Sequence, residues 1–446
     1  MNIGEKQLKI IENIKFFLNS LKLKDVDDSL SSFCYFTSWS ETPGYARIKL
    51  QSEGWPFIFK YCKIILKNIL AIASHSSYKE ICKNTSEKNY DVMLLSWSFK
   101  KNFLSDGSFQ DRYFNVNSNN LNNVFWILIS IDGYVPPNLK DNIKIIKKNE
   151  GIFKYNFFSF IKIIFLTLFK YRFSLNKLYH YTFFHSYFAK FIASIVQREF
   201  KKNKFKALLV PYEAQPFQNY IFSESKKTNK KILNIGYLHS LPPLTSEMAY
   251  RSGAPDLLLV HGRQQIEILK NILNWPEKSL ILIKSLRFRL NDKSLSEKVY
   301  IPLSLHDQNK LINEFERLLA NYDKNSFPQF EISDHPAIYK SRKHLKFKKK
   351  IEQVLEKYKD RFSKDKKNIS IFLGVTAAVL EALEKGVEVF HICSDPVFQS
   401  YNKDIWKKIN VTKISDCIFQ YKLETKGQYI DFDKSATLDT YLNKIL

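Results

Sequence analysis

The sequence predicts an α/β protein with two Rossmann-like, doubly wound domains that face a cleft. Short apolar runs alternate with amphipathic stretches through the middle and the C-terminal part of the chain. Such alternation indicates parallel sheets covered by helices on both faces. The length of 446 residues suits two large domains. The polar stretch Ser285–Lys298 separates two series of apolar runs, so we expect domains at 1–290 and 291–446.

The expected strands are short runs rich in β-branched and aromatic residues. In the N-terminal domain they are Cys34–Trp39, Asp91–Trp97, Val124–Ile131, Lys206–Val210, Ile232–Leu238, Asp256–Val260 and Leu280–Lys284. In the C-terminal domain they are Val299–Leu303, Gln329–Ile332, Ile369–Leu373, Val387–Ile392 and Cys417–Tyr421. Helices are expected between them, at Gln215–Thr228, Gln264–Leu273, Asp307–Ala320 and Phe347–Lys359.

The composition excludes several common classes of protein. Only 12 residues are Gly and no G-x-G occurs, so the sequence has neither the dinucleotide-binding fingerprint nor a Walker A loop. The five Cys are widely spaced without a C-x-x-C pair, which argues against a disulfide framework or a zinc ribbon and favours a reducing cytosol.

Most of the net charge of +25 lies in two stretches, with net +12 over residues 140–206 and net +9 over residues 340–367. The first is also aromatic, and we expect a helical insertion in the N-terminal domain at about 135–204. Its apolar run Phe157–Phe169 is 13 residues long, short of the ~20 residues that cross a bilayer. Two interpretations remain open, namely contact with an anionic membrane surface and a pair of core helices with solvated lysines. Nucleic acid is the least favoured partner, because no DNA- or RNA-binding motif accompanies the charge.

The first candidate site follows the expected strand Lys206–Val210. A carboxylate at a strand-to-helix turn, here Glu213, is well placed to accept a proton from a sugar hydroxyl. The alternative is that Glu213 only caps the next helix. Tyr212 lies beside it, and His239 ends the next strand, so both are candidates for substrate binding.

The second candidate site is His335-Pro336, just beyond the expected strand Gln329–Ile332. A histidine at a strand end can donate hydrogen bonds to a phosphate and stabilise a leaving group. Arg342 follows closely and adds positive charge.

The third candidate site is the segment from Gly374 to Glu381, where a strand turns into a helix. We expect Thr376 in the first turn of this helix, whose exposed N–H groups and dipole would bind an anion. Glu381, one turn deeper, could accept hydrogen bonds from a ribose. The alternative is an ordinary strand–helix–strand unit.

A fourth stretch, Ser105–Tyr113, follows the expected strand Asp91–Trp97 and contains Asp106, which we hold as a reserve base. A structural turn is an equally good interpretation of this loop.

After His335-Pro336 the sequence has an expected strand, Gly374, an expected helix with Thr376 and Glu381-Ala382-Leu383, then Gly386 and a second expected strand. This order of elements resembles the donor domain of GT-B glycosyltransferases. More narrowly, it resembles bacterial sialyltransferases and Kdo transferases that use CMP-activated sugars, and the region around Glu213 and His239 looks like surface-carbohydrate biosynthesis proteins. The resemblance implies that His335 and Thr376 hold the donor phosphate and that Glu381 binds ribose. It covers mainly residues 205–395. The acidic pair that sialyltransferases carry before a Gly is not reproduced, since Asp106 is the single carboxylate before Gly107.

The resemblance and the candidate sites together predict a glycosyltransferase that moves a sugar from a nucleotide-sugar, with CMP as the best guess, to a surface glycan or glycolipid acceptor. The alternatives are a polyol-phosphate transferase on the same fold and a non-catalytic partner of glycan machinery docked at the membrane. The two D-x-D sequences, at Asp25 and Asp431, follow no convincing nucleotide-site strand, so we predict no metal and no cofactor. The expected location is cytoplasmic, with the cytoplasmic face of the inner membrane as an open alternative.

Overall fold

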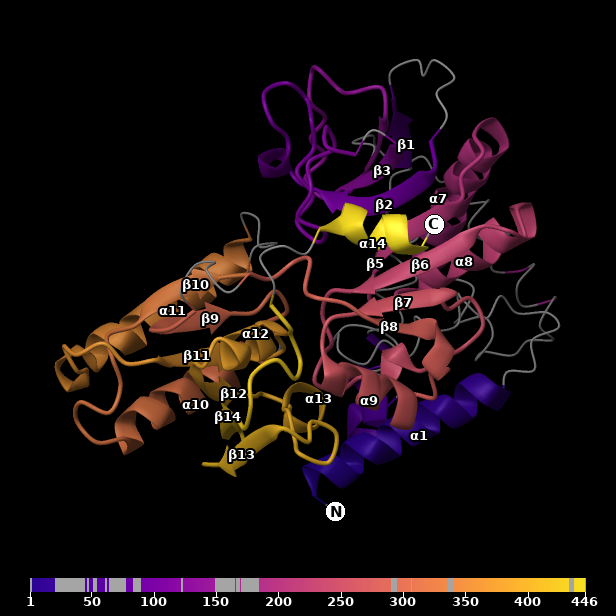
Figure 1. The fold of residues 1–446 in the computed structure, drawn as a ribbon. Helices are drawn as coiled ribbons and strands as arrows, with labels where there is room; N and C mark the ends of the chain where they lie inside the picture. Colours follow the sequence, from indigo (N-terminus) through magenta and orange to yellow (C-terminus); the bar gives the residue numbers. More distant parts are fainter. Residues whose placement is uncertain are drawn as a thin grey trace.

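The computed structural model has a mixed α/β architecture built on two largely parallel sheets (Figure 1). This confirms the predicted class of fold. The described residues are 2–20, 45, 48–50, 54–60, 62–63, 78–82, 90–121, 123–148, 165, 169, 184–289, 295–305, 307–335, 341–432 and 437–445.

The first sheet has eight strands in the order β1-β4-β3-β2-β5-β6-β7-β8. All neighbours pair in parallel except β1 and β4. The strands are β1 (Tyr78–Ile81), β2 (Val92–Ser98), β3 (Val124–Ser130), β4 (Ile143–Lys148), β5 (Ala207–Tyr212), β6 (Leu233–Leu238), β7 (Leu257–Val260) and β8 (Leu280–Leu282). The long buried runs of β2, β3 and β5 are typical of parallel strands covered on both faces.

The helices of this part are α1 (Ile3–Ser20), α7 (Phe184–Lys202), α8 (Pro216–Thr228) and α9 (Arg263–Asn271). Short 3-10 turns lie at η2 (Trp55–Phe57), η3 (Lys100–Asn102), η4 (Ser246–Met248) and η5 (Glu277–Ser279). Helix α7 packs along α8 (Figure 1). Within the described part of the chain, none of the helices combines the length and the apolar character that crossing a bilayer requires.

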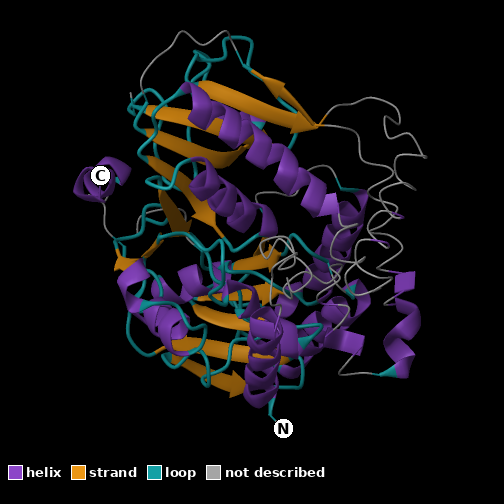
Figure 2. Ribbon diagram, turned by 90° about the vertical axis from the view of Figure 1, so that its right-hand side faces the viewer, coloured by secondary structure: helices purple, strands orange, loops and turns teal. Residues whose placement is uncertain are grey.

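The second sheet has six strands in the order β10-β9-β11-β12-β14-β13, and Figure 2 shows the two sheets as separate groups of strands. The strands are β9 (Lys298–Ile301), β10 (Glu331–Asp334), β11 (Ile369–Leu373), β12 (Glu388–Ile392), β13 (Ile409–Lys413) and β14 (Ile418–Leu423). The first four are parallel, and β14 is antiparallel to both of its neighbours. Its helices are α10 (Gln308–Asn321), α11 (Arg342–Lys357), α12 (Ala378–Glu384) and α13 (Pro396–Gln399), with a 3-10 turn η6 (Lys359–Arg361).

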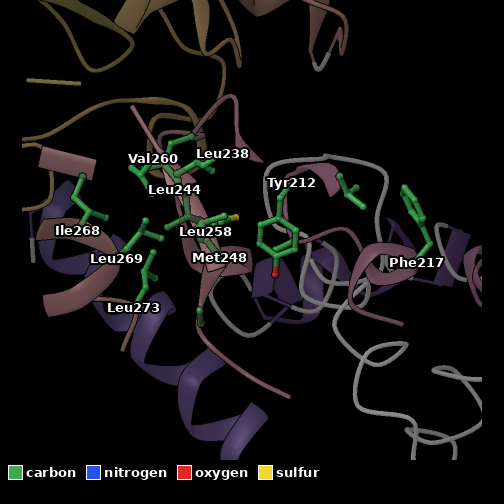
Figure 3. Close-up of a cluster of buried hydrophobic side chains, with 14 of the residues drawn as sticks. Tyr212, Phe217, Leu238, Leu244, Met248, Leu258, Val260, Ile268, Leu269 and Leu273 are labelled. Carbon is green, nitrogen blue, oxygen red and sulfur yellow. The ribbon is translucent and has the colours of Figure 1, made fainter. Parts of the chain in front are cut away.

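A continuous hydrophobic cluster joins the two sheets. It contains Leu208 of β5 and Leu258 of β7 as well as Phe372 of β11 and Tyr421 of β14. Figure 3 shows its part around β7 and α9. The last helix, α14 (Leu438–Ile445), belongs to the other side of the first sheet, because Leu438 and Leu442 lie in its second buried cluster. The chain therefore returns to the first sheet after completing the second.

The predicted strands within the described residues are all present, and Cys34–Trp39 lies outside them. The predicted helical insertion from about residue 135 is wrong at its start, because β4 is a strand inside the sheet. Ile143, Ile145 and Ile146 of β4 are fully buried. The lysines between and after these isoleucines are the reason why the sequence predicts a basic helix here. The predicted helical character is correct for α7, and residues 149–183, except 165 and 169, lie outside the described residues.

One lysine of this basic stretch is buried in an ion-pair network. Lys144 of β4 is 5% exposed, and its Nζ lies 2.5 Å from Glu199 of α7 and 3.2 Å from Glu80 of β1. Arg198 also pairs with Glu80. The network therefore ties α7 to the edge of the sheet.

We predict that Glu199→Ala lowers the free energy of unfolding by about 3 kcal/mol, because it removes the nearest partner of a buried ammonium. The double variant Lys144→Met/Glu199→Leu, which removes both charges, should be far closer to the wild type. Urea unfolding of the three proteins checks this. A loss under ~0.5 kcal/mol for Glu199→Ala would show that the pair contributes nothing to stability.

Candidate active site at the strand ends

Glu213 and His239 face each other because of the register of β5 and β6. Tyr212 and Leu238, the last residues of these parallel strands, are paired, so the residues that follow them are also side by side. His239 Nε2 lies 2.8 Å from Glu213 Oε1. Gln215 and Ser240 donate hydrogen bonds of 2.9 and 3.1 Å to the same carboxylate. The structure thus brings the predicted base and a predicted substrate-binding residue into direct contact.

The environment fixes the charge of this pair. Burial raises the pKa of Glu213, but the His239 ring and the hydrogen bonds from Gln215 and Ser240 outweigh it and lower the pKa to about 2. Burial also lowers the pKa of His239, and the opposing effect of the Glu213 charge is smaller. At neutral pH the pair is therefore a carboxylate that accepts a hydrogen bond from a neutral imidazole.

The turn that carries Glu213 is strained and firmly held. Ala214 has a left-handed backbone with φ of 52°, which is unfavourable for a residue with a Cβ. The Glu213 N–H donates to Gln218 Oε1 at 3.0 Å, and the guanidinium of Arg251 donates to the Ala214 carbonyl at 2.9 Å. Gln215, not Glu213, is the N-cap residue of α8. The capping alternative for Glu213 is therefore wrong.

The loop after β2 reaches this pair through Tyr113. The Tyr113 and His239 rings meet edge to face with their centroids 4.5 Å apart. Asp111 anchors the loop, since its carboxylate accepts 2.7 Å hydrogen bonds from the N–H groups of Tyr113 and Phe114 and another from the Ser96 hydroxyl. Burial raises the pKa of Asp111 to about 6, although these hydrogen bonds oppose the rise.

Arg287, which the sequence analysis placed only in a domain boundary, also belongs to the site. Its guanidinium carbon lies 5.5 Å from the Tyr113 ring centroid and 4.8 Å from that of Phe288. The Tyr237 hydroxyl accepts hydrogen bonds from the N–H groups of Leu286 and Arg287, at 3.1 and 3.2 Å. The same hydroxyl lies 3.2 Å from Nδ1 of His261. His261 directly follows β7, so the strand-end criterion that found His239 could also have found it.

His335, from the second sheet, lies within electrostatic reach of these residues. It directly follows β10, and its N–H donates to the Ile301 carbonyl of β9 at 3.1 Å. Burial lowers the pKa of His335 to about 4, with a further decrease from the charge of Arg287 and an opposing increase from Glu213. We call Tyr113, Glu213, His239, Arg287 and His335 the strand-end cluster. It combines residues from both sheets.

The third predicted site lies at the same edge of the second sheet but is built differently from the prediction. Helix α12 begins at Ala378 with Ala377 as its N-cap, so Thr376 precedes the helix. The Thr376 hydroxyl accepts a 3.2 Å hydrogen bond from the Ala378 N–H. The prediction that Thr376 lies in the first helical turn is therefore wrong. Gly374 has φ of 62°, a left-handed conformation that glycine adopts without strain, so a turn at Gly374 separates β11 from the start of α12.

The remaining predicted residues of the second domain are Glu381, Arg342 and Pro336. Glu381 forms a largely buried ion pair of 2.8 Å with Lys385 one turn along α12. Arg342 is the exposed first residue of α11. Pro336 lies outside the described residues.

Asp106 has the contacts of a turn residue. Its carboxylate accepts hydrogen bonds from the N–H and hydroxyl of Ser108 and from the Asn119 amide, and it lies 3.4 Å from Lys140 Nζ. These hydrogen bonds lower the pKa of Asp106, Ser108 contributing most. The turn interpretation explains all of these contacts.

Tyr212 is buried in the core rather than exposed to a substrate. Its ring packs among hydrophobic side chains (Figure 3). Its hydroxyl lies 2.7 Å from the Asn219 side-chain amide. Burial raises the pKa of Tyr212 to about 12. The predicted role in substrate binding does not fit this position.

A cavity of about 1060 Å³ lies elsewhere, at the N-terminal ends of β9, β10 and β11. Lys298, Glu331 and Asn368 are among its lining residues, and no residue of the strand-end cluster is. Among the described residues, no group of three or more His, Cys, Asp and Glu side chains is arranged to hold a metal ion.

Comparison with known proteins leaves the family open. No family model and no curated protein matches this chain. Among solved structures, the chain is similar to the N-terminal domain of trehalose-6-phosphate phosphatase from Candida albicans, with 9% identity and a TM-score of 0.33 over 68% of this chain and 82% of that one. A likeness this weak carries no argument about function.

We predict that Asp111 makes stability depend on pH. Its folded pKa of about 6 exceeds the ordinary value of ~3.9, so the folded protein keeps a proton that the unfolded chain releases. The stabilisation of the folded state by this proton is fully present below about pH 4. It is lost as the pH rises through 6, by at most about 1.4 kcal/mol per pH unit. Asp111→Asn, which retains an acceptor for Tyr113 and Phe114, should remove it.

Urea unfolding at pH 4.5, 5.5 and 6.5 checks this in the difference between variant and wild type. Other titrating groups cancel in that difference. Parallel pH profiles for the two proteins would contradict the assignment.

Proposed function

We propose that this protein is a glycosyltransferase that uses a nucleotide-sugar donor, with CMP as the preferred nucleotide. The observation that carries the proposal is the strand-end cluster, in which Glu213, held by His239 at the end of the first sheet, lies within electrostatic reach of His335, which directly follows β10 of the second sheet. Ligands of open α/β sheets bind outside the carboxyl ends of the strands, where these residues lie. A carboxylate suits the removal of a proton from the acceptor, and a nearby histidine suits the stabilisation of a leaving phosphate.

In the proposed reaction, an acceptor hydroxyl attacks the anomeric carbon of the donor sugar. The bond from this carbon to the phosphate oxygen breaks as the new glycosidic bond forms, and the nucleotide leaves with the bonding electrons. Glu213 takes the proton of the hydroxyl late in the step, once the new bond to carbon has made that proton strongly acidic, because a carboxylate with a pKa of about 2 is a weak base. His239 orients the carboxylate through their 2.8 Å hydrogen bond. His335 donates a hydrogen bond to the departing phosphate, and the turn at Gly374 and Thr376 borders that phosphate.

The acceptor in this proposal is a surface glycan or glycolipid, and the protein meets it at a membrane surface. Several exposed aromatic side chains support that contact. Phe165 and Phe169, four residues apart in the basic aromatic stretch, are 56% and 68% exposed. Trp55 and Phe59 are more than 80% exposed. Exposed aromatic rings beside lysines are typical of surfaces that bind anionic lipid.

We predict that Glu213→Gln lowers kcat by about 100- to 10,000-fold, because the amide cannot take a proton. His335→Ala should lower it by about 100-fold or more. Glu331→Gln, an exposed change at the opposite end of β10, is the matched control and should leave the rate unchanged. The measurement is sugar transfer and hydrolysis with CMP-, UDP- and GDP-sugars.

Retained transfer in both Glu213→Gln and His335→Ala would exclude the proposed mechanism. Turnover of UDP- or GDP-sugars alone would show that the donor carries UDP or GDP instead of CMP. Binding without turnover by the wild type would favour the non-catalytic alternative.

We also predict that donor binding strengthens as the pH falls. The pKa of His335 is about 4, and a bound phosphate would raise it, so the complex takes up a proton. CMP affinity should therefore increase between pH 7 and pH 5, before the CMP phosphate itself becomes fully monoanionic. Calorimetry in buffers of different ionisation enthalpy measures the uptake directly. The uptake should disappear in His335→Ala, and equal uptake in both proteins would contradict the role of His335.

A further inference from the structure

The guanidinium of Arg287 is held by aromatic rings rather than by a carboxylate. It packs against Tyr113 and Phe288, and among the described residues it forms no ion pair. The nearby acids are already engaged, since Asp111 binds two backbone N–H groups and Glu213 binds His239. Arg287 therefore has hydrogen-bond donors to offer to a ligand.

Two further cations, Arg112 and Lys101, lie on the connection that follows β2 of the first sheet. Arg112 precedes Tyr113, and burial together with the charge of Arg287 lowers its pKa against the opposing effect of Tyr113. Burial and the charge of Arg112 lower the pKa of Lys101, which lies in η3 after β2, and the charge of Asp132 opposes this decrease. The like charges of Arg287 and Arg112 repel each other, and a bound anion would relieve that repulsion.

The backbone at Arg287 is fixed from beneath. Tyr237 is fully buried, and its hydroxyl accepts the N–H groups of Leu286 and Arg287. His261, also buried, holds the Tyr237 hydroxyl on its other side. An arginine whose main chain and ring contacts are both fixed loses little freedom when it binds a ligand.

We propose that a phosphate group of the substrate binds between Arg287 and His335, with Arg112 and Lys101 extending the positive surface. The planar fork of an arginine matches two oxygens of a phosphate. Arg287 comes from the connection after β8 and His335 from β10, so the bound phosphate bridges the two sheets. This inference rests on the proposed function, which supplies the phosphate either as the nucleotide donor or as a phosphorylated acceptor.

The test measures binding of inorganic pyrophosphate to the full chain by calorimetry at low ionic strength. Arg287→Gln should weaken binding at least ten-fold, and Arg287→Lys, which keeps the charge but not the fork, should lie between it and the wild type. Arg317→Gln is the matched control, because Arg317 is an exposed residue of α10 that pairs with Glu314. Thermal unfolding of each variant establishes that it is folded.

Two further probes identify the source of the phosphate. If CMP binds more tightly than glucose 1-phosphate and depends on Arg287, the phosphate belongs to the donor, and the reverse order assigns it to the acceptor. Either order supports the site. Unchanged pyrophosphate binding in Arg287→Gln, or an equal loss in Arg317→Gln, would overturn it. A site that depends on Arg287 in a protein without sugar transfer would preserve this inference and remove the proposed reaction.

Discussion

The packing that joins the two sheets is the constraint on which the site depends. Among the hydrogen bonds that cross the junction are Asp431 N–H to the His261 carbonyl at 2.6 Å, Gln264 N–H to the Gln428 carbonyl at 2.9 Å, and the Trp406 indole to the Pro243 carbonyl at 3.0 Å. Gly262 makes this close approach feasible, because a Cβ there would lie 2.3 Å from the Tyr429 carbonyl oxygen. The strand ends that carry Glu213 and His335 are thereby held in fixed positions relative to each other.

Strand ends are the part of the site that a sequence can predict. Glu213, His239 and His335 each follow a recognisable apolar run, and parallel pairing then aligns neighbouring ends. Arg287 follows no such rule. Its place depends on the buried Tyr237 hydroxyl and on the Tyr113 ring, which belong to distant segments. Contacts of this kind require the folded chain.

The errors have equally local causes. The alternating lysines and isoleucines of β4 favoured the prediction of a basic helix. The residue that neutralises Lys144 is a glutamate of α7, 55 residues later, and this pairing is visible only in the folded chain. The helix after β11 starts later than expected, since the left-handed Gly374 turn uses extra residues. The two basic stretches of the sequence did not locate the site either. Several lysines in the two basic stretches are paired, as in Lys206–Asp91 and Lys348–Asp334, whereas Arg287 lies outside both stretches.

The central claim is that residues of both sheets hold one substrate phosphate. A double-mutant cycle on CMP binding with Arg287→Gln and His335→Ala tests it most directly. If both side chains contact the same phosphate, the losses in binding free energy should be non-additive by about 1 kcal/mol or more. Additive losses, or no loss from either change, would contradict a phosphate shared between the two sheets.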